Sequence, residues 1–115
     1  MRKSDKKLDN QIRLALTDVC ESALKKIHGF EWLTHSAQYD RFPDSLRVTC
    51  IFDTNEHLEA FKASTANQQL QQQIQDELQP IGIRIRTIQK QVAYDTEENC
   101  ERFHDGNWAR RLQDG

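Results

Sequence analysis

Residues 46–52 alternate strictly between two kinds of side chain, and this pattern limits the possible folds more than any other. Leu46, Val48, Cys50 and Phe52 alternate with Arg47, Thr49 and Ile51. Successive side chains of a strand point to opposite faces, so a period of two predicts a strand with one buried and one wetter face. Such a strand needs partner strands beside it and helices over its buried face.

Two long helices are predicted on either side of this strand. Apolar residues spaced three and four apart predict the first: Leu8, Ile12, Ala15, Leu16, Val19, Ala23 and Ile27. We expect it to begin at Ser4 and to end at Gly29. Leu58, Phe61, Leu70, Ile74 and Leu78 form the apolar stripe of the second, which begins near Asp53 to Asn55. The polar run at 64–67 interrupts this stripe and predicts a kink or a restart there.

Two more strands complete the expected sheet. Residues 30–39 are aromatic, β-branched or small, and the turn chemistry of 40–45 predicts that they pair with 46–52 as a hairpin. In 81–86, Ile81, Ile83 and Ile85 alternate with Arg84 and Arg86, which predicts the third strand. The apolar parity then shifts near residue 87, so we expect a bulge or a crossing at a sheet edge.

The resulting fold class is α+β, in the order α-β-β-α-β. The expected architecture is a three-stranded sheet with both long helices on one face and a short C-terminal tail. A chain of 115 residues has room for one hydrophobic core. We therefore expect one domain over residues 1–95. Residues 96–115 form a tail that is partly helical or frayed, or that docks an aromatic side chain on the core.

Composition and charge favour a cytoplasmic protein. The three cysteines, Cys20, Cys50 and Cys100, are far apart and odd in number, which is typical of thiols in a reducing compartment. No apolar run is long enough for a membrane span, and the charged start does not resemble a signal peptide. The net charge of −2 argues against nucleic-acid binding driven by global charge, but a local basic surface is compatible with it.

Motifs for catalysis and for cofactor binding are missing from the sequence. Cys100 and His104 are spaced one helical turn apart, but two ligands do not make a metal site. His28, His35 and His57 are scattered singly. The sequence has no G-x-S-x-G motif and no Gly-rich phosphate loop. We therefore expect no enzyme activity, no metal, no cofactor and no small-molecule ligand. A pocket that gathers His35 or His57 with carboxylates would reverse that expectation.

One surface invites a binding hypothesis: the sheet face opposite the helices. The candidate nucleic-acid-binding residues are Trp32, Arg47, Arg84, Arg86 and Lys90. An open sheet that carries an aromatic ring and several cations can stack bases and bind the phosphates of RNA or DNA. The alternative is that the arginines are merely solvated, while Trp32 and Ile51 pack under the tail or under a protein partner or second copy of the chain.

A helix-turn-helix regulator is a further alternative. Residues 68–78, the Pro-Ile-Gly turn and residues 83–92 can be divided into two short helices around a turn. The alternation of 81–86 and its β-branched residues favour the strand instead.

Three segments resemble a family of short proteobacterial proteins, some of which are labelled Fis-family transcriptional regulators. The segments are residues 2–11, 30–35 and 41–46, and the resemblance covers most of the chain. The element order also resembles the type II KH-like domain of ribosome-binding factor A, with residues 63–67 where that fold's helices bend. The Gly-x-x-Gly phosphate clamp of KH domains is absent, so the resemblance does not imply RNA binding by that clamp.

Overall fold

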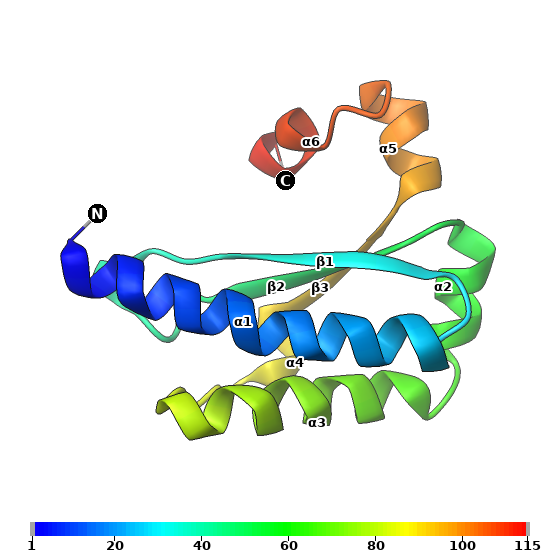
Figure 1. Cartoon of the computed structure of the whole chain (residues 1–115). Helices are drawn as coiled ribbons and strands as arrows, with labels where there is room; N and C mark the ends of the chain where they lie inside the picture. The colour runs from blue at the N-terminus through cyan, green and yellow to red at the C-terminus, as the bar shows by residue number, and fades with distance from the viewer. Residues whose placement is uncertain (1, 115) are drawn as a thin grey trace.

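A computed structural model describes residues 2–114 of the chain. A three-stranded sheet lies at its centre, with the strands in the order β1-β2-β3 (Figure 1). β1 (Phe30–Ser36) is antiparallel to β2 (Arg47–Phe52), and β2 is parallel to β3 (Val92–Thr96). The structure confirms the predicted α+β class, the order α-β-β-α-β and the hairpin. β1 ends three residues earlier than expected, because residues 39–41 form the short helix η1 (Tyr39–Arg41).

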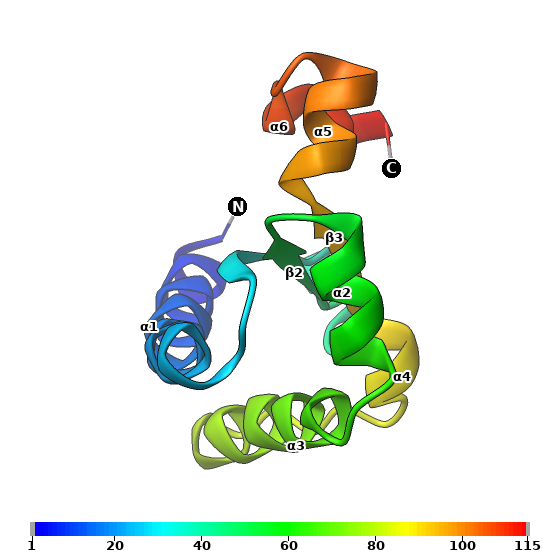
Figure 2. The ribbon, with the colours of Figure 1, turned by 90° about the vertical axis from the view of Figure 1, so that its right-hand side faces the viewer.

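The two long helices lie on the same side of the sheet, as predicted (Figures 1 and 2). They are α1 (Lys3–Lys26) and α3 (Ala66–Leu78). α1 begins before Ser4, without a side-chain cap. The expected interruption of the second helix is a complete break, which separates α2 (Asn55–Lys62) from α3. The Ser64 hydroxyl donates to the Phe61 carbonyl and accepts the N–H of Ala66 across this break, so it competes with helical hydrogen bonds.

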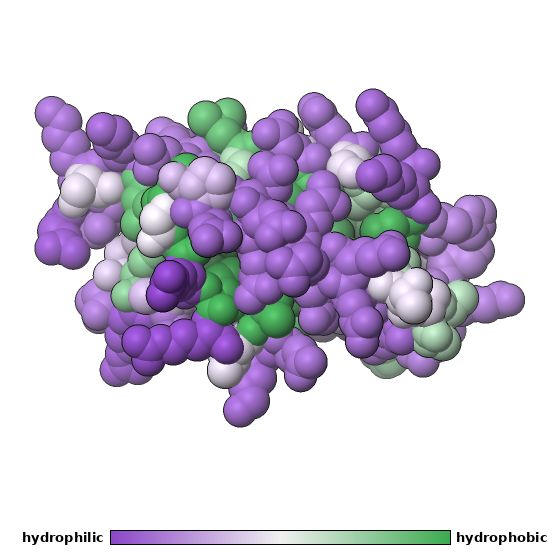
Figure 3. Space-filling view, turned by 90° about the horizontal axis from the view of Figure 1, so that it is seen from below, coloured by the Kyte–Doolittle hydropathy of each residue, from purple (hydrophilic) through white to green (hydrophobic). Residues whose placement is uncertain are grey.

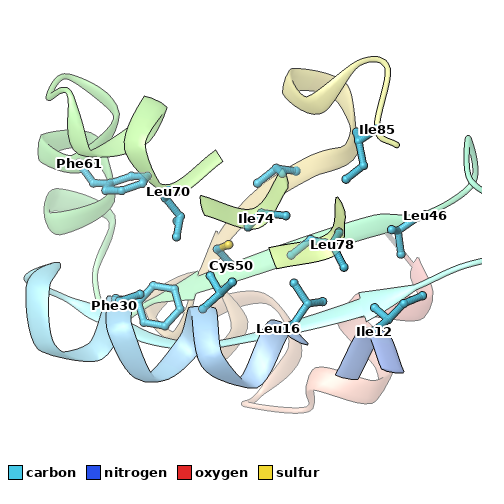
Figure 4. Packing of buried hydrophobic residues seen from close by; sticks show 14 of the residues in the cluster. Ile12, Leu16, Phe30, Leu46, Cys50, Phe61, Leu70, Ile74, Leu78 and Ile85 are labelled. Atoms are coloured by element: carbon cyan, nitrogen blue, oxygen red, sulfur yellow. The ribbon is translucent and has the colours of Figure 1, made fainter. Parts of the chain in front are cut away.

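The core lies between the sheet and these helices. Seen from below, the molecule presents mostly hydrophilic side chains with separate hydrophobic patches (Figure 3). Ile12 and Leu16 of α1, Cys50 of β2 and Ile74 of α3 all point into this core (Figure 4). Cys50 is completely buried, and this burial raises the pKa of its thiol to about 12. All three cysteines are free thiols.

The predicted third strand at 81–86 is wrong. Residues 79–81 form the short helix η2 (Gln79–Ile81), Gly82 turns the chain with φ +84°, and no residue from 83 to 86 is in a strand. Ile83 and Ile85 are nevertheless buried, while Gly82, Arg84 and Arg86 beside them are exposed. An irregular segment that crosses the core can therefore alternate between buried and exposed side chains as a strand does. After α4 (Ile88–Gln91), β3 takes the place beside β2.

One irregularity in β1 decides which side chains face the core. Phe30 pairs with Phe52, yet Trp32 pairs with Ile51, so β1 has one residue more than β2 at this point. Such a bulge changes the parity of the strand. As a result Phe30 is buried in the core, while Trp32 lies on the opposite face. We call that face the outer face; its residues are Trp32, Thr34, Ser36, Arg47, Thr49, Ile51, Ala93 and Asp95.

The C-terminal residues form two helices on the side of the outer face (Figures 1 and 2). They are α5 (Glu97–His104) and α6 (Trp108–Asp114). The Thr96 hydroxyl caps α5 by accepting the N–H of Asn99 and donates to Asn55 at the start of α2. The binding hypothesis assumes that the outer face is open, and this is wrong for the part of the face that α5 and α6 cover. Among residues 2–114, no helix combines the length and apolar character that a membrane span requires.

Candidate binding site

A cavity of about 400 Å³ lies where α6 passes over the outer face of the sheet. Its floor comes from all three strands and its roof from α6. Ligand pockets in proteins typically measure about 300–1,000 Å³, so this volume suits a small molecule. The lining residues are Thr34, His35, Ser36, Arg47, Thr49, Ala93, Tyr94, Asp95, Arg111 and Leu112.

A single carboxylate fixes α5 and α6 to β1. Glu97 Oε1 accepts a hydrogen bond from the indole N–H of Trp32 at 2.7 Å, and Oε2 accepts one from the indole of Trp108 at 2.9 Å. The two indoles also meet edge to face, with ring centroids 5.0 Å apart. The expected aromatic docking of the tail therefore occurs at Trp32. The ring of Trp32 contacts Trp108 and its N–H is bonded to Glu97, which reduces what Trp32 offers to a nucleobase.

An ion pair one turn further along α6 fixes this helix to β3. The guanidinium of Arg111 donates from Nε to Asp95 Oδ2 at 2.6 Å and from Nη2 to Oδ1 at 2.9 Å. This two-point contact raises the pKa of Arg111. Because both charges are satisfied by each other, the Asp95 carboxylate on the cavity wall repels an incoming anion only weakly.

Arg47 is the cation at this cavity that has no partner. It lies opposite Ser36 in the hairpin, and its side chain is exposed. Within residues 2–114 it makes no hydrogen bond by its side chain and no ion pair. The hydroxyls of Thr34, Ser36 and Thr49 lie on the cavity floor beside it. A free guanidinium beside three hydroxyls suits an acidic group.

The structure places the other predicted binding residues elsewhere. Arg84 and Arg86 are in the irregular segment after η2, and Lys90 is in α4. Trp32 and Arg47 share the outer face but stand toward opposite ends of the hairpin. The five candidates therefore do not form one patch.

Gln91 holds the segment that contains Lys90 against the turn that precedes Arg47. Its side-chain amide is buried and donates at 3.0 Å to the carbonyls of Pro43 and Leu46. It also accepts a hydrogen bond from the hydroxyl of Thr87. As a result Lys90, which precedes Gln91, and Arg47, which follows Leu46, lie at the same end of the sheet.

Arg84 and Arg86 border a second hollow, which lies along α3. It measures about 350 Å³, and Gln75 in its wall donates to the carbonyl of Ile85 at 3.3 Å. The acid in its lining, Asp76, accepts a hydrogen bond from Gln72. The remaining lining residues are Gln79, Ile83 and Ile85.

Two histidines have carboxylate partners that the sequence did not reveal. His35 Nε2 lies 2.8 Å from Asp9 Oδ1, which also accepts the hydroxyl of Tyr39. These hydrogen bonds, the one from Tyr39 first, lower the pKa of Asp9. His57 Nδ1 lies 2.7 Å from Asp53 Oδ1. The first contact joins α1 to β1 and η1, and the second joins the end of β2 to α2, so both have a structural role.

The cavity roof is the part that sequence reasoning missed. Trp108, Arg111 and Leu112 are spaced three and four apart, which places them on one face of a helix. That spacing was the available signal for a docked α6. Among the described residues, no group of three or more His, Cys, Asp or Glu side chains is arranged to hold a metal ion.

Comparison with protein-family models, with curated proteins and with solved structures gives no match to this chain.

Proposed function

We propose that the chain is a non-catalytic module that binds RNA or DNA through the phosphate backbone. The observation that carries this proposal is a stretch of seventeen residues, 78–94, that contains Arg84, Arg86 and Lys90 but no acidic residue. All three side chains are exposed. Within the described part of the chain, none of them is in an ion pair.

The position of this stretch supports the proposal. Gln91 holds it against the turn before Arg47, so a fourth free cation lies at the same end of the sheet. Cations on an ordered backbone lose little backbone entropy when they meet phosphates. Backbone contacts of this kind bind nucleic acid without reading its sequence. Since Trp32 is packed on Trp108, the proposal does not rely on base stacking at that residue.

Fluorescence anisotropy with labelled single- and double-stranded oligonucleotides at two salt concentrations tests this function. Four phosphate contacts predict that affinity for a single strand falls about 50-fold between 50 and 200 mM salt. The double variant Arg84→Gln/Arg86→Gln should bind more weakly and show a salt slope shallower by about 1.4. The matched control, Lys25→Gln/Lys26→Gln, removes the same charge at the far end of α1 and should bind like the wild type. Absence of binding at low salt would refute the proposal.

A second candidate, association with a protein partner or a second copy of the chain, is favoured by the edge of β1. Within residues 2–114 this strand pairs with β2 alone, and a groove of about 320 Å³ between it and α1 is lined by residues that include Leu16, Cys20 and Leu33. Sheet edges are common sites of strand addition. Analytical ultracentrifugation tests self-association. A concentration-independent monomer would rule out the homodimer.

A further inference from the structure

We propose that the cavity between the outer face and α6 binds a small organic anion, with a carboxylate or phosphate on an apolar body. The acidic group would lie at Arg47 and the apolar body between Ala93 and Leu112. This inference does not depend on the proposed nucleic-acid function. It assigns the cavity a ligand of a different class; Arg47 is common to both sites, whereas Arg84, Arg86 and Lys90 are not in the cavity lining.

The cavity lining has one positive charge that no other lining residue compensates. Its ionisable lining comprises Arg47, Asp95, Arg111, His35 and Tyr94. Asp95 and Arg111 satisfy each other through two hydrogen bonds. The side chains of His35 and Tyr94 point to the inner face of the sheet, where His35 is bonded to Asp9 and the hydroxyl of Tyr94 donates to Asn67. Burial raises the pKa of Tyr94 to about 12, so this phenol stays neutral. Arg47 therefore supplies one uncompensated positive charge, which an anion of one unit charge would neutralise.

The floor of the cavity is polar, and its roof has an apolar part. The hydroxyls of Thr34, Ser36 and Thr49 can donate to the remaining oxygens of an acidic group, as an anion site requires. Leu112 on the roof lines the cavity and is 40% exposed. An apolar ligand body would remove this surface from water. The polar floor and the apolar roof thus select an amphipathic molecule over inorganic phosphate alone.

Contacts within the chain hold α6 over the sheet. The contacts of Glu97 with Trp32 and Trp108 and the ion pair of Arg111 with Asp95 fix the helix to the sheet. The roof is therefore held in place by contacts within the chain, and none of them involves Arg47. Binding then needs little reorganisation of the chain.

Nuclear magnetic resonance titration of the full chain with benzoate, phenyl phosphate, inorganic phosphate and benzyl alcohol tests the inference. Benzoate or phenyl phosphate should give saturable shifts at the amides of Thr34, Ser36, Thr49 and Ala93. Benzyl alcohol lacks the charge and inorganic phosphate lacks the body, so both should bind at least 10-fold more weakly. The comparison of benzoate with phenyl phosphate identifies the preferred acid.

Two variants locate the binding. Arg47→Gln should weaken binding by about 10- to 100-fold, because it removes a charge-assisted hydrogen bond from an exposed position that does not support the fold. Ala93→Leu should block the apolar part of the cavity and abolish the advantage of the organic anions over inorganic phosphate. Arg84→Gln/Arg86→Gln should leave anion binding unchanged, which separates this site from the nucleic-acid surface. No saturable shift for either organic anion, or equal affinity in Arg47→Gln, would overturn the inference.

Discussion

Replacing Glu97 with Gln tests whether one carboxylate holds the C-terminal helices on the sheet. Each carboxylate oxygen accepts one indole N–H, from Trp32 and from Trp108. Glutamine keeps the shape but offers one accepting oxygen and one donating amide. One indole N–H must then face another donor. The substitution therefore removes one hydrogen bond and creates a repulsive contact without leaving a cavity.

The expected loss follows from the surroundings of these groups. A hydrogen bond to a charged group contributes about 1.5–3 kcal/mol, and both indoles and the carboxylate are half-buried, which places this bond near the lower end. We expect the docking of α5 and α6 to weaken by about 1–2 kcal/mol, a value that falls within the usual range for point substitutions.

Tryptophan emission measures this effect directly, because Trp32 and Trp108 are the only two tryptophans in the chain. In Glu97→Gln the emission should shift to longer wavelength, and the urea midpoint measured by emission should fall. Glu101→Gln is the matched control, since Glu101 is in the same helix and makes no hydrogen bond by its side chain within residues 2–114. Identical emission and identical midpoints in the two variants would refute the bridging role of Glu97.

Three other substitutions test local features of the fold. Gly29→Ala should destabilise the protein by about 2 kcal/mol or more, because φ is +87° and the new Cβ would stand 2.6 Å from the Cβ of His57. Gly82→Ala, where φ is +84° but no atom lies within 4 Å, should cost only about 1 kcal/mol, so equal thermal midpoints would contradict the clash. Hydrogen bonds lower the pKa of Asp9, so its stabilisation is present above about pH 4 and is lost as pH falls through the folded pKa. Urea unfolding from pH 5 to pH 2 should therefore show a shallower loss in Asp9→Asn, and an unchanged slope would contradict this role.

The hairpin and the helices could be predicted because each has a local cause. The alternation of 46–52 and the spacing of 8–27 report which side chains meet the core, and in both segments the backbone adopts the regular form with that period. Residues 64–67 carry their own break signal, since the Ser64 hydroxyl bonds the local backbone. These features depend on neighbours in the sequence.

The third strand and the cavity could not be predicted in the same way. Ile83 and Ile85 alternate because every second side chain enters the core, but the hydrogen bonds of a strand need a free neighbour. Residues 92–96 pair with β2 in place of 81–86. The sequence of 81–86 by itself does not indicate that another segment pairs with β2. The cavity depends on contacts between Trp32 and Trp108 that are 76 positions apart in the numbering. Such pairings become visible only when the fold is known.

The bulge in β1 leads to a prediction that is opposite to the usual expectation for a deletion inside a strand. Phe30 and Trp32 face opposite sides although they are two residues apart, because Glu31 is the extra residue in the register. Deleting Glu31 would make β1 regular, with Phe30 still opposite Phe52 and Trp32 still opposite Ile51. We therefore expect this deletion to keep Phe30 in the core and Trp32 on the outer face, at a modest cost in stability.

Deleting Thr34 is the matched control, because it also removes one residue from β1. Here no bulge absorbs the loss, so one half of the strand must turn over. Either Leu33 turns out of the core and Trp32 turns into it, or His35 turns to the outer face and breaks its contact with Asp9. Burial of one large apolar side chain stabilises a fold by about 1.5–3 kcal/mol, so this deletion should cost several kcal/mol more than the deletion of Glu31. Urea unfolding of both variants decides the matter: equal midpoints would mean that the bulge does not set the facing of Trp32.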